Sequence, residues 1–235
     1  FATLGLVEQA NAVTADNDKI AIGGAGNNVH LAIGGGTAIA GGSIAIGPKS
    51  TADGVQGGAV AIGKETVSKG NNALALATAA NATGAKATAI GSDTTASAIE
   101  ATAVGNRANA TKVNASSFGT YAAAHGENST AVGNHASATG VNAQAFGSNA
   151  KASEGNATAI GNSANSAGEN ATASGTNANA TGLNSIAMGI ESKAQANRTV
   201  AIGDGASAAK ENATAIGNTA IVREANAIAI AGAFP

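Results

Sequence analysis

Few side chains in this chain of 235 residues have types and spacings that could do chemistry. Its histidines are His30, His125 and His135, and no acidic partner accompanies them at the spacing of a metal site. Cysteine is absent, which excludes disulfides, thiolate metal ligands and thiol catalysis. Every serine occupies a repeat position that is elsewhere filled by Ala or Thr, so no Ser, His and Asp cluster stands out. We expect no enzyme activity, no cofactor and no metal site.

Three further patterns have a structural interpretation that outweighs the chemical one. Gly-Gly-Ala-Gly at 23–26 and Gly-Gly-Gly at 34–36 could cradle phosphate, but no helical period follows them, so we interpret them as turns. Asn-x-Ser/Thr triplets such as Asn156-Ala157-Thr158 arise from the repeat and are a weak glycosylation signal. Phe118 and Phe146 are interpreted as interface packing, because a stacking platform for bases would need exposed aromatics.

The composition is unusual for a folded domain. Aromatic residues make up 2% and charged residues 11%, against a usual charged share of about 25%. Hydrophobic residues reach 44%, mostly Ala, Ile and Val, so close backbone approach must replace a core of large side chains. A net charge of −2 with scattered Lys and Arg gives no reason to expect nucleic acid or an anionic membrane as partner. No apolar run approaches the ~18 residues of a spanning helix.

One 14-residue period organises most of the chain. Ala-Ile-Gly-like triplets recur in steps of 14 from Gly63 to Gly217, with Ala77 in place of one glycine and Ala231 at the last position. We call this position the glycine slot. Around it small and large residues alternate with period two, which predicts strands and not helices. Alanines two and four residues before the slot, and three and five after it, are predicted to face each other inside a flattened two-sheet solenoid.

Corners are predicted where residues that tolerate left-handed backbone recur. Asparagine recurs five residues before the glycine slot, and the slot itself is the second corner. The predicted turn residues are Asn114, Asn128, Asn142, Asn156, Asn170, Asn184, Asn212, Gly105, Gly119, Gly133, Gly147, Gly161, Gly175, Gly189, Gly203 and Gly217.

An outward apolar row predicts self-association. The residue before each glycine slot is large and apolar in all coils but that of Ser174. Burying each such side chain is worth roughly 1.5–3 kcal/mol, so another surface should cover the row. Identical copies around a closed axis supply one, although these residues do not fix the number of chains. The predicted interface comprises Ile62, Leu76, Ile90, Val104, Phe118, Val132, Phe146, Ile160, Met188, Ile202, Ile216 and Ile230.

The repeat resembles the head of trimeric autotransporter adhesins, the YadA-like heads. Asn156-Ala-Thr-Ala-Ile-Gly161, Asn184-Ser-Ile-Ala-Met-Gly189 and Asn128-Ser-Thr-Ala-Val-Gly133 match the Asn-Ser-Val-Ala-Ile-Gly repeat of that family. The resemblance implies an all-β, left-handed parallel β-roll assembled as a homotrimer. It also implies secretion by an autotransporter route to the Gram-negative outer membrane. It further implies attachment to host cells or to matrix proteins such as collagen, fibronectin or laminin, and autoaggregation.

The domain organisation is expected to be simple. Residues 1–18 are predicted to form an irregular cap, 19–58 irregular β-roll coils, and 59–235 one regular head domain. Two extra residues are expected in the turn around 53–56, because Gly47 and Gly63 are 16 apart. The chain starts without Met or a signal peptide, so we expect a piece of a longer protein. Any membrane attachment should then come from a C-terminal anchor outside this sequence.

Two other functions deserve comparison. Threonines three residues before the glycine slot could order ice, but Gln144, Ile186, Val200 and Ile228 interrupt that row and large apolar residues lie beside it. Ice binding remains the alternative function. Hexapeptide acyltransferases are also β-solenoids, but their 18-residue coils do not fit a 14-residue period, which disfavours an enzyme of that class.

Overall fold

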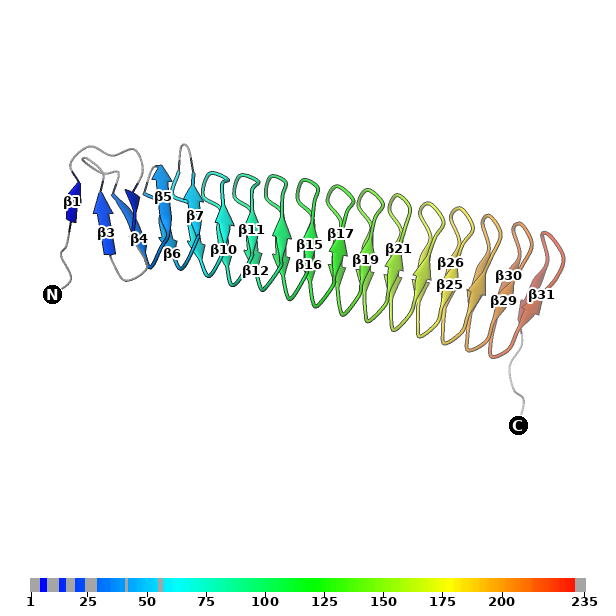
Figure 1. Cartoon of the computed structure of the whole chain (residues 1–235). Helices are drawn as coiled ribbons and strands as arrows, with labels where there is room; N and C mark the ends of the chain where they lie inside the picture. The colour runs from blue at the N-terminus through cyan, green and yellow to red at the C-terminus, as the bar shows by residue number, and fades with distance from the viewer. Residues whose placement is uncertain are drawn as a thin grey trace. The chain divides into compact units, whose positions relative to one another are not determined.

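The computed structural model describes residues 5–7, 13–15, 20–23, 29–40, 42–54 and 57–230. These residues form strands and turns, with no helix among them (Figure 1). Contacts within the chain divide it into two compact units, residues 1–118 and 119–235, and each is described by itself. In both units the strands belong to two sheets, which we call sheet A and sheet B of that unit.

Unit 1 begins with irregular strands and continues with regular ones. Its sheet A holds β1 (Gly5–Val7), β3 (Ile20–Gly23), β4 (His30–Ile33), β6 (Ile44–Ile46), β8 (Val60–Ile62), β10 (Leu74–Leu76), β12 (Thr88–Ile90), β14 (Thr102–Val104) and β16 (Ser116–Phe118). Its sheet B holds β2 (Val13–Thr14), β5 (Thr37–Ala40), β7 (Thr51–Asp53), β9 (Val67–Ser68), β11 (Asn81–Ala82), β13 (Thr95–Ala96) and β15 (Asn109–Ala110).

Unit 2 repeats a single pattern, with three-residue strands in one sheet and two-residue strands in the other. Its sheet A holds β18 (Thr130–Val132), β20 (Gln144–Phe146), β22 (Thr158–Ile160), β24 (Thr172–Ser174), β26 (Ile186–Met188), β28 (Val200–Ile202), β30 (Thr214–Ile216) and β32 (Ile228–Ile230). Its sheet B holds β17 (Ala123–Ala124), β19 (Ser137–Ala138), β21 (Lys151–Ala152), β23 (Asn165–Ser166), β25 (Asn179–Ala180), β27 (Lys193–Ala194), β29 (Ser207–Ala208) and β31 (Ile221–Val222).

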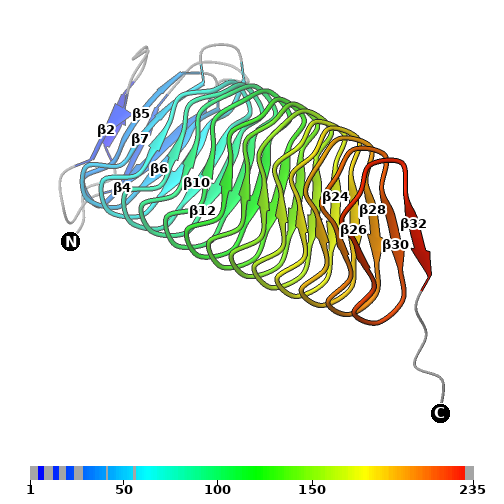
Figure 2. The same ribbon diagram turned by 90° about the vertical axis from the view of Figure 1, so that its right-hand side faces the viewer.

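The regular coils stack in parallel at a constant register. Thr158 lies beside Thr172 in sheet A, and Lys151 lies beside Asn165 in sheet B, in both cases a step of one coil. Backbone hydrogen bonds join the same positions of adjacent coils, as from Gly161 N to Phe146 O at 2.8 Å. Figure 2 shows the coils from the end, as flattened loops with a strand on each long side. The predicted all-β parallel solenoid of 14-residue coils is confirmed.

Alanine fills the interior in both units. Most alanines predicted to point inward, such as Ala157 and Ala159 before a glycine slot and Ala150 and Ala152 after one, have no exposed surface. In the last coil Ala227 and Ala229 are half-buried. Serine and threonine take some inward positions. The Ser166 hydroxyl donates to Ala171 O at 2.8 Å, whereas the buried hydroxyls of Ser117 and Ser185 have no hydrogen-bond partner among the described residues. Such an interior leaves no space for a ligand, because alanine side chains from the two sheets already meet.

The parallel stack starts later than the sequence predicts. A parallel roll was expected from about Ile20, but β3 pairs antiparallel with β4, with Ile20 beside Ile33. β2 also pairs antiparallel, with β5. β1 and β3 pair in parallel, but the uninterrupted parallel ladder begins only with β4 and β6, where Leu31 lies beside Ile44. The physical reason is the connection between the strands. Residues 34–43, which include β5 of sheet B, join β4 to β6 and bring the chain back in the same direction, whereas only the six residues 24–29 join β3 to β4, a length typical of a hairpin.

The longer coil around 53–56 adopts the expected spacing. β6 and β8 pair with Ile44 beside Val60, and β7 and β9 pair with Thr51 beside Val67. Two more residues than in a regular coil therefore separate these partners. Val55 and Gln56 lie outside the described residues, as do most of residues 1–18 and Ala231.

Both corners of each coil use left-handed backbone. The asparagines before the glycine slot have φ near +55°, as at Asn156 (φ 55) and Asn170 (φ 55). Gly161 has φ 128, and a Cβ there would come within 2.6 Å of Gly175 O in the next coil. A second left-handed residue follows two positions after the slot, as at His135 (φ 54) and Ser163 (φ 54). The sequence does not reveal this third position, because residues of many types occupy it.

Candidate interaction surfaces

The outward row beside the glycine slots lies on sheet A, and in the single chain it meets solvent. Ile160 is 45% exposed and Met188 is 43% exposed, which is high for large apolar side chains. Ile62, Phe118, Ile202, Ile216 and Ile230 are also exposed, whereas Leu76, Ile90, Val104, Val132 and Phe146 are half-buried. The structure thus places every residue of the predicted interface on the outer side of sheet A. Whether these residues meet other chains stays a prediction.

A second outward row runs beside the first, two residues earlier in each strand. It is aliphatic at Val60 and Leu74 in the first regular coils and at Ile186, Val200 and Ile228 in the last ones, where Thr214 interrupts it. Between them it carries mostly threonine, at 88, 102, 130, 158 and 172. These threonines are half-buried next to large apolar neighbours, so they do not form the separate, continuous threonine surface that ordering of ice would need.

Sheet B presents a mostly polar outer side in both units, with Val67, Ala123 and Ile221 among its apolar positions. Its outward positions carry Asn109, Ser137, Lys151, Asn165 and Lys193 among others. Asn165 donates from Nδ2 to Asn179 Oδ1 at 2.9 Å, which links neighbouring coils. The two sheets therefore share an alanine interior but differ outside, one side apolar and the other polar.

An asparagine ladder runs along one corner of unit 2. Asn128, Asn142, Asn156 and Asn170 each donate from Nδ2 to Oδ1 of the asparagine one coil later, at 3.3, 3.0, 2.9 and 3.1 Å, and Asn184 accepts the last of these bonds. The sequence indicated these asparagines as turn residues only. Their constant 14-residue spacing on parallel strands was the signal that could have predicted the side-chain ladder, because it places identical groups one above another.

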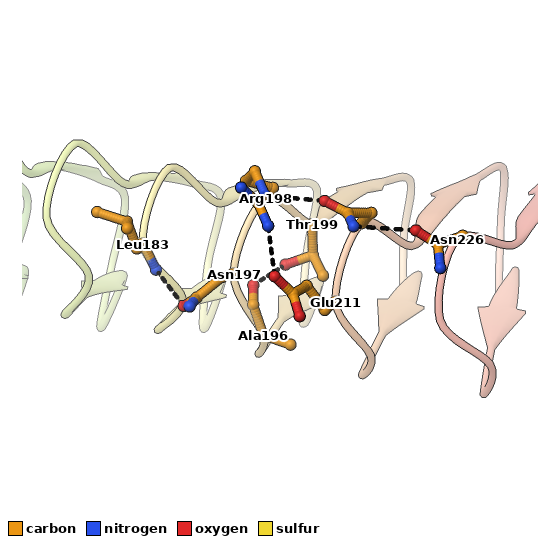
Figure 3. Close-up of polar contacts among 8 residues, drawn as sticks. Leu183, Ala196, Asn197, Arg198, Thr199, Glu211 and Asn226 are labelled. Carbon is orange, nitrogen blue, oxygen red and sulfur yellow. Dashed lines mark hydrogen bonds and ion pairs between the residues drawn. The ribbon is translucent and has the colours of Figure 1, made fainter.

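The same corner accepts charged residues where asparagine is absent. Arg198 takes the position in its coil, donates from Nε to Asn212 Oδ1 at 2.8 Å and pairs with Glu211 (Figure 3). Asn212 in turn donates to Asn226 at 3.0 Å. In unit 1, Lys86 and Glu100 occupy this position and pair at 2.7 Å, and the Glu100 carboxylate raises the pKa of the Lys86 ammonium. These exposed contacts link coils at the corner.

The described residues contain no cluster of three or more metal-ligating side chains. His135 stacks on Tyr121 of the preceding coil, with ring centroids 4.7 Å apart, and His30 is buried at the start of β4. Among the described residues, no helix is long and apolar enough to cross a membrane. Each unit offers surfaces of repeated side chains on the outer sides of its two sheets, which suit association with another chain or an extended partner.

Comparison with known proteins agrees with this geometry. The profile of the YadA head domain repeat matches residues 38–57, 56–76, 82–108, 110–136, 138–164, 152–178, 166–189, 180–206 and 208–230, well over half of the chain. The crystal structure of the collagen-binding domain of the Yersinia adhesin YadA is similar, with 27% identity over 64% of this chain and 69% of that one and a TM-score of 0.38. No curated protein matches the chain. By the profile match and the repeat that carries it, this chain belongs to the family of YadA head domain repeats and has an adhesin-type function.

Proposed function

We propose that this chain forms the head of a homotrimeric adhesin on the surface of a Gram-negative bacterium. In this proposal the head is exported by an autotransporter route and attaches the cell to host matrix proteins, collagen, fibronectin or laminin, or to host cells. The head has no catalytic role and needs no cofactor. Autoaggregation would follow from the same repeated surfaces meeting on neighbouring cells.

One observation carries the assembly: the apolar outer side of sheet A. Large side chains such as Ile160, Met188 and Ile216 are exposed in one chain although sheet B is polar. Covering each is worth roughly 1.5–3 kcal/mol, comparable over a few residues with the whole stability of a domain. Copies of the same chain can cover the row, because each copy has its own apolar row with the same distance between successive side chains. Family membership favours three copies around one axis.

The outer polar surface supports attachment to extended ligands. Sheet B and the corners repeat similar groups every ~4.8 Å along each unit. A long, repetitive partner can make many weak contacts with such a surface, and these add through effective concentration. A fibrous matrix protein has this form. A compact small molecule would instead need a pocket.

Two measurements test the proposal. Multi-angle light scattering of the purified chain should give the mass of a trimer, and a monomer at micromolar concentration would contradict the assembly. The trimer should then bind immobilised collagen, fibronectin or laminin more strongly than immobilised albumin. An intact trimer that binds none of these proteins and no host cells would contradict the attachment function while leaving the assembly standing.

A further inference from the structure

One strand interrupts the apolar outer side of sheet A in unit 2. β24 presents two hydroxyls outward, from Thr172 and Ser174. The strands on either side set Ile160 and Met188 next to Ser174, at a separation of one coil. Every other sheet A strand from β4 onward carries Ile, Leu, Val, Phe or Met at the position of Ser174. The break is therefore local and lies within a continuous apolar row.

A repeated apolar row cannot by itself choose an axial register. Ile202, Ile216 and Ile230 are identical and occupy equivalent positions in successive coils. If one chain of a trimer slid by one coil, ~4.8 Å, apolar residues would still meet apolar residues. The same near-identity that makes the coils stack leaves several registers close in free energy. Something in the row must differ if one arrangement is to dominate.

We propose that Thr172 and Ser174 fix the axial register of the three chains. The inference rests on the proposed trimer. In register, the three Ser174 hydroxyls reach the same level, where each can donate to one neighbour and accept from the other, with water in the space left by the short side chains. A slide of one coil sets them against Ile160 or Met188 of another chain, and a buried hydroxyl without a partner is unfavourable. A single polar position in an apolar seam fixes register in coiled coils for the same reason.

The chain contains a natural reporter of register. Met188 is its single methionine and lies one coil from Ser174 on the same row. In a threefold trimer the three Met188 methyl groups are equivalent and give one resonance. A staggered trimer cannot keep threefold symmetry, because its chains have different neighbours, so its methyl groups give several resonances. NMR of the head labelled at the methionine methyl group therefore reports the register, and light scattering independently reports the mass of the assembly.

The wild-type trimer should give one methionine methyl resonance. Ser174→Ile should keep the trimer mass but split this resonance, because the apolar row becomes continuous. Thr172→Val combined with Ser174→Ala removes both hydroxyls without adding length and should split it too. Ser137→Ile makes the same exchange on the outer side of sheet B and should leave one resonance. Adding Ile202→Ser to Ser174→Ile moves the polar level by two coils and should restore one resonance.

The outcomes separate the two proposals. A monomeric wild-type chain would contradict the proposed trimer itself. A trimeric wild type with several methionine resonances would overturn the register proposal alone. So would trimeric Ser174→Ile and Thr172→Val/Ser174→Ala variants that each keep one resonance, since the register would then be set elsewhere.

Discussion

Sheet A and sheet B enclose the same interior but face different surroundings. Ala159 on β22 and Ala152 on β21 are equally buried, whereas Ile160 and Lys151, which adjoin them, point outward with opposite character. The alternation of a strand separates these two roles at every second residue. Inward positions accept only small side chains and define the coil. Outward positions are free to carry either an apolar seam or a polar surface.

The largest effect should come from placing a charge on the apolar side. Ile160→Asp should weaken or dissociate the trimer, because an unpaired carboxylate in an apolar seam costs on the order of several kcal/mol per chain. Light scattering across a dilution series measures the change. Circular dichroism should stay that of the wild type, since Ile160 is 45% exposed in the single chain.

The matched control lies on the other sheet. Lys151→Asp puts the same carboxylate on the polar side of the adjacent strand and should leave the trimer mass unchanged. If Lys151→Asp dissociates the trimer as strongly as Ile160→Asp, the assignment of sheet A as the interface is wrong.

The shared interior should respond alike from either sheet. Ala159→Leu and Ala152→Leu each force a larger side chain between sheets that already touch, and overpacking costs typically ~1–3 kcal/mol or more. Both should lower the melting temperature by similar amounts. Thr158→Leu, one residue away but outward, should not destabilise the coil. A large difference between the two alanine variants would show that the sheets do not share one interior equally.

Much of this fold could be predicted because its signals are local and repeated. Glycine at the position of Gly161 and alanine at that of Ala159 recur every 14 residues. The position of the strands, the direction of their side chains and the length of the coil therefore follow from the sequence. The antiparallel pairing of β3 with β4 could not be predicted, since it depends on a short connection and on pairing between segments without a repeat. The left-handed backbone at Tyr121 and His135 was also missed, because neither residue type indicates it.

The candidate surfaces could also be predicted only in part. The alternation of Ile160 with Ala159 identified the outward row, but nothing in one chain measures how many copies cover it. The asparagine ladder was missed because each asparagine already had a turn role, and a side-chain bond between coils requires the three-dimensional register. Lys86, Glu100 and Arg198 show that the corner needs left-handed backbone more than it needs asparagine.

A smaller change in stability is expected where a row of asparagines on sheet B is interrupted by another residue. Asn165 and Asn179 are adjacent and bonded, but Thr95 separates Asn81 from Asn109. The Oδ1 atoms of Asn81 and Asn109 are buried and lack a hydrogen-bond partner within the described part of the chain. Thr95→Asn should complete the row and stabilise the fold by about 0.5–1.5 kcal/mol.

Asn165→Ala supplies the opposite test, since it removes an existing bond and should destabilise the fold by a similar amount. Thermal unfolding followed by circular dichroism measures both variants. A Thr95→Asn variant that melts lower than the wild type would contradict the idea that a continuous amide row stabilises sheet B.

The smallest effect is expected for ligand binding by single residues on the polar side. Lys151→Ala should change the affinity for an immobilised matrix protein by less than about fivefold, because most interface side chains contribute under ~1 kcal/mol when truncated. Its equivalents in other coils present comparable polar groups, so a long ligand retains most of its contacts. Shortening the head by deleting residues 148–189, three complete coils from one glycine slot to another, removes many contacts at once and should weaken binding far more. Surface plasmon resonance on immobilised ligand compares the two, with trimer mass checked for each. If Lys151→Ala abolishes binding while the trimer persists, the ligand is held at one discrete site, and the repeated polar side of sheet B is not the attachment surface.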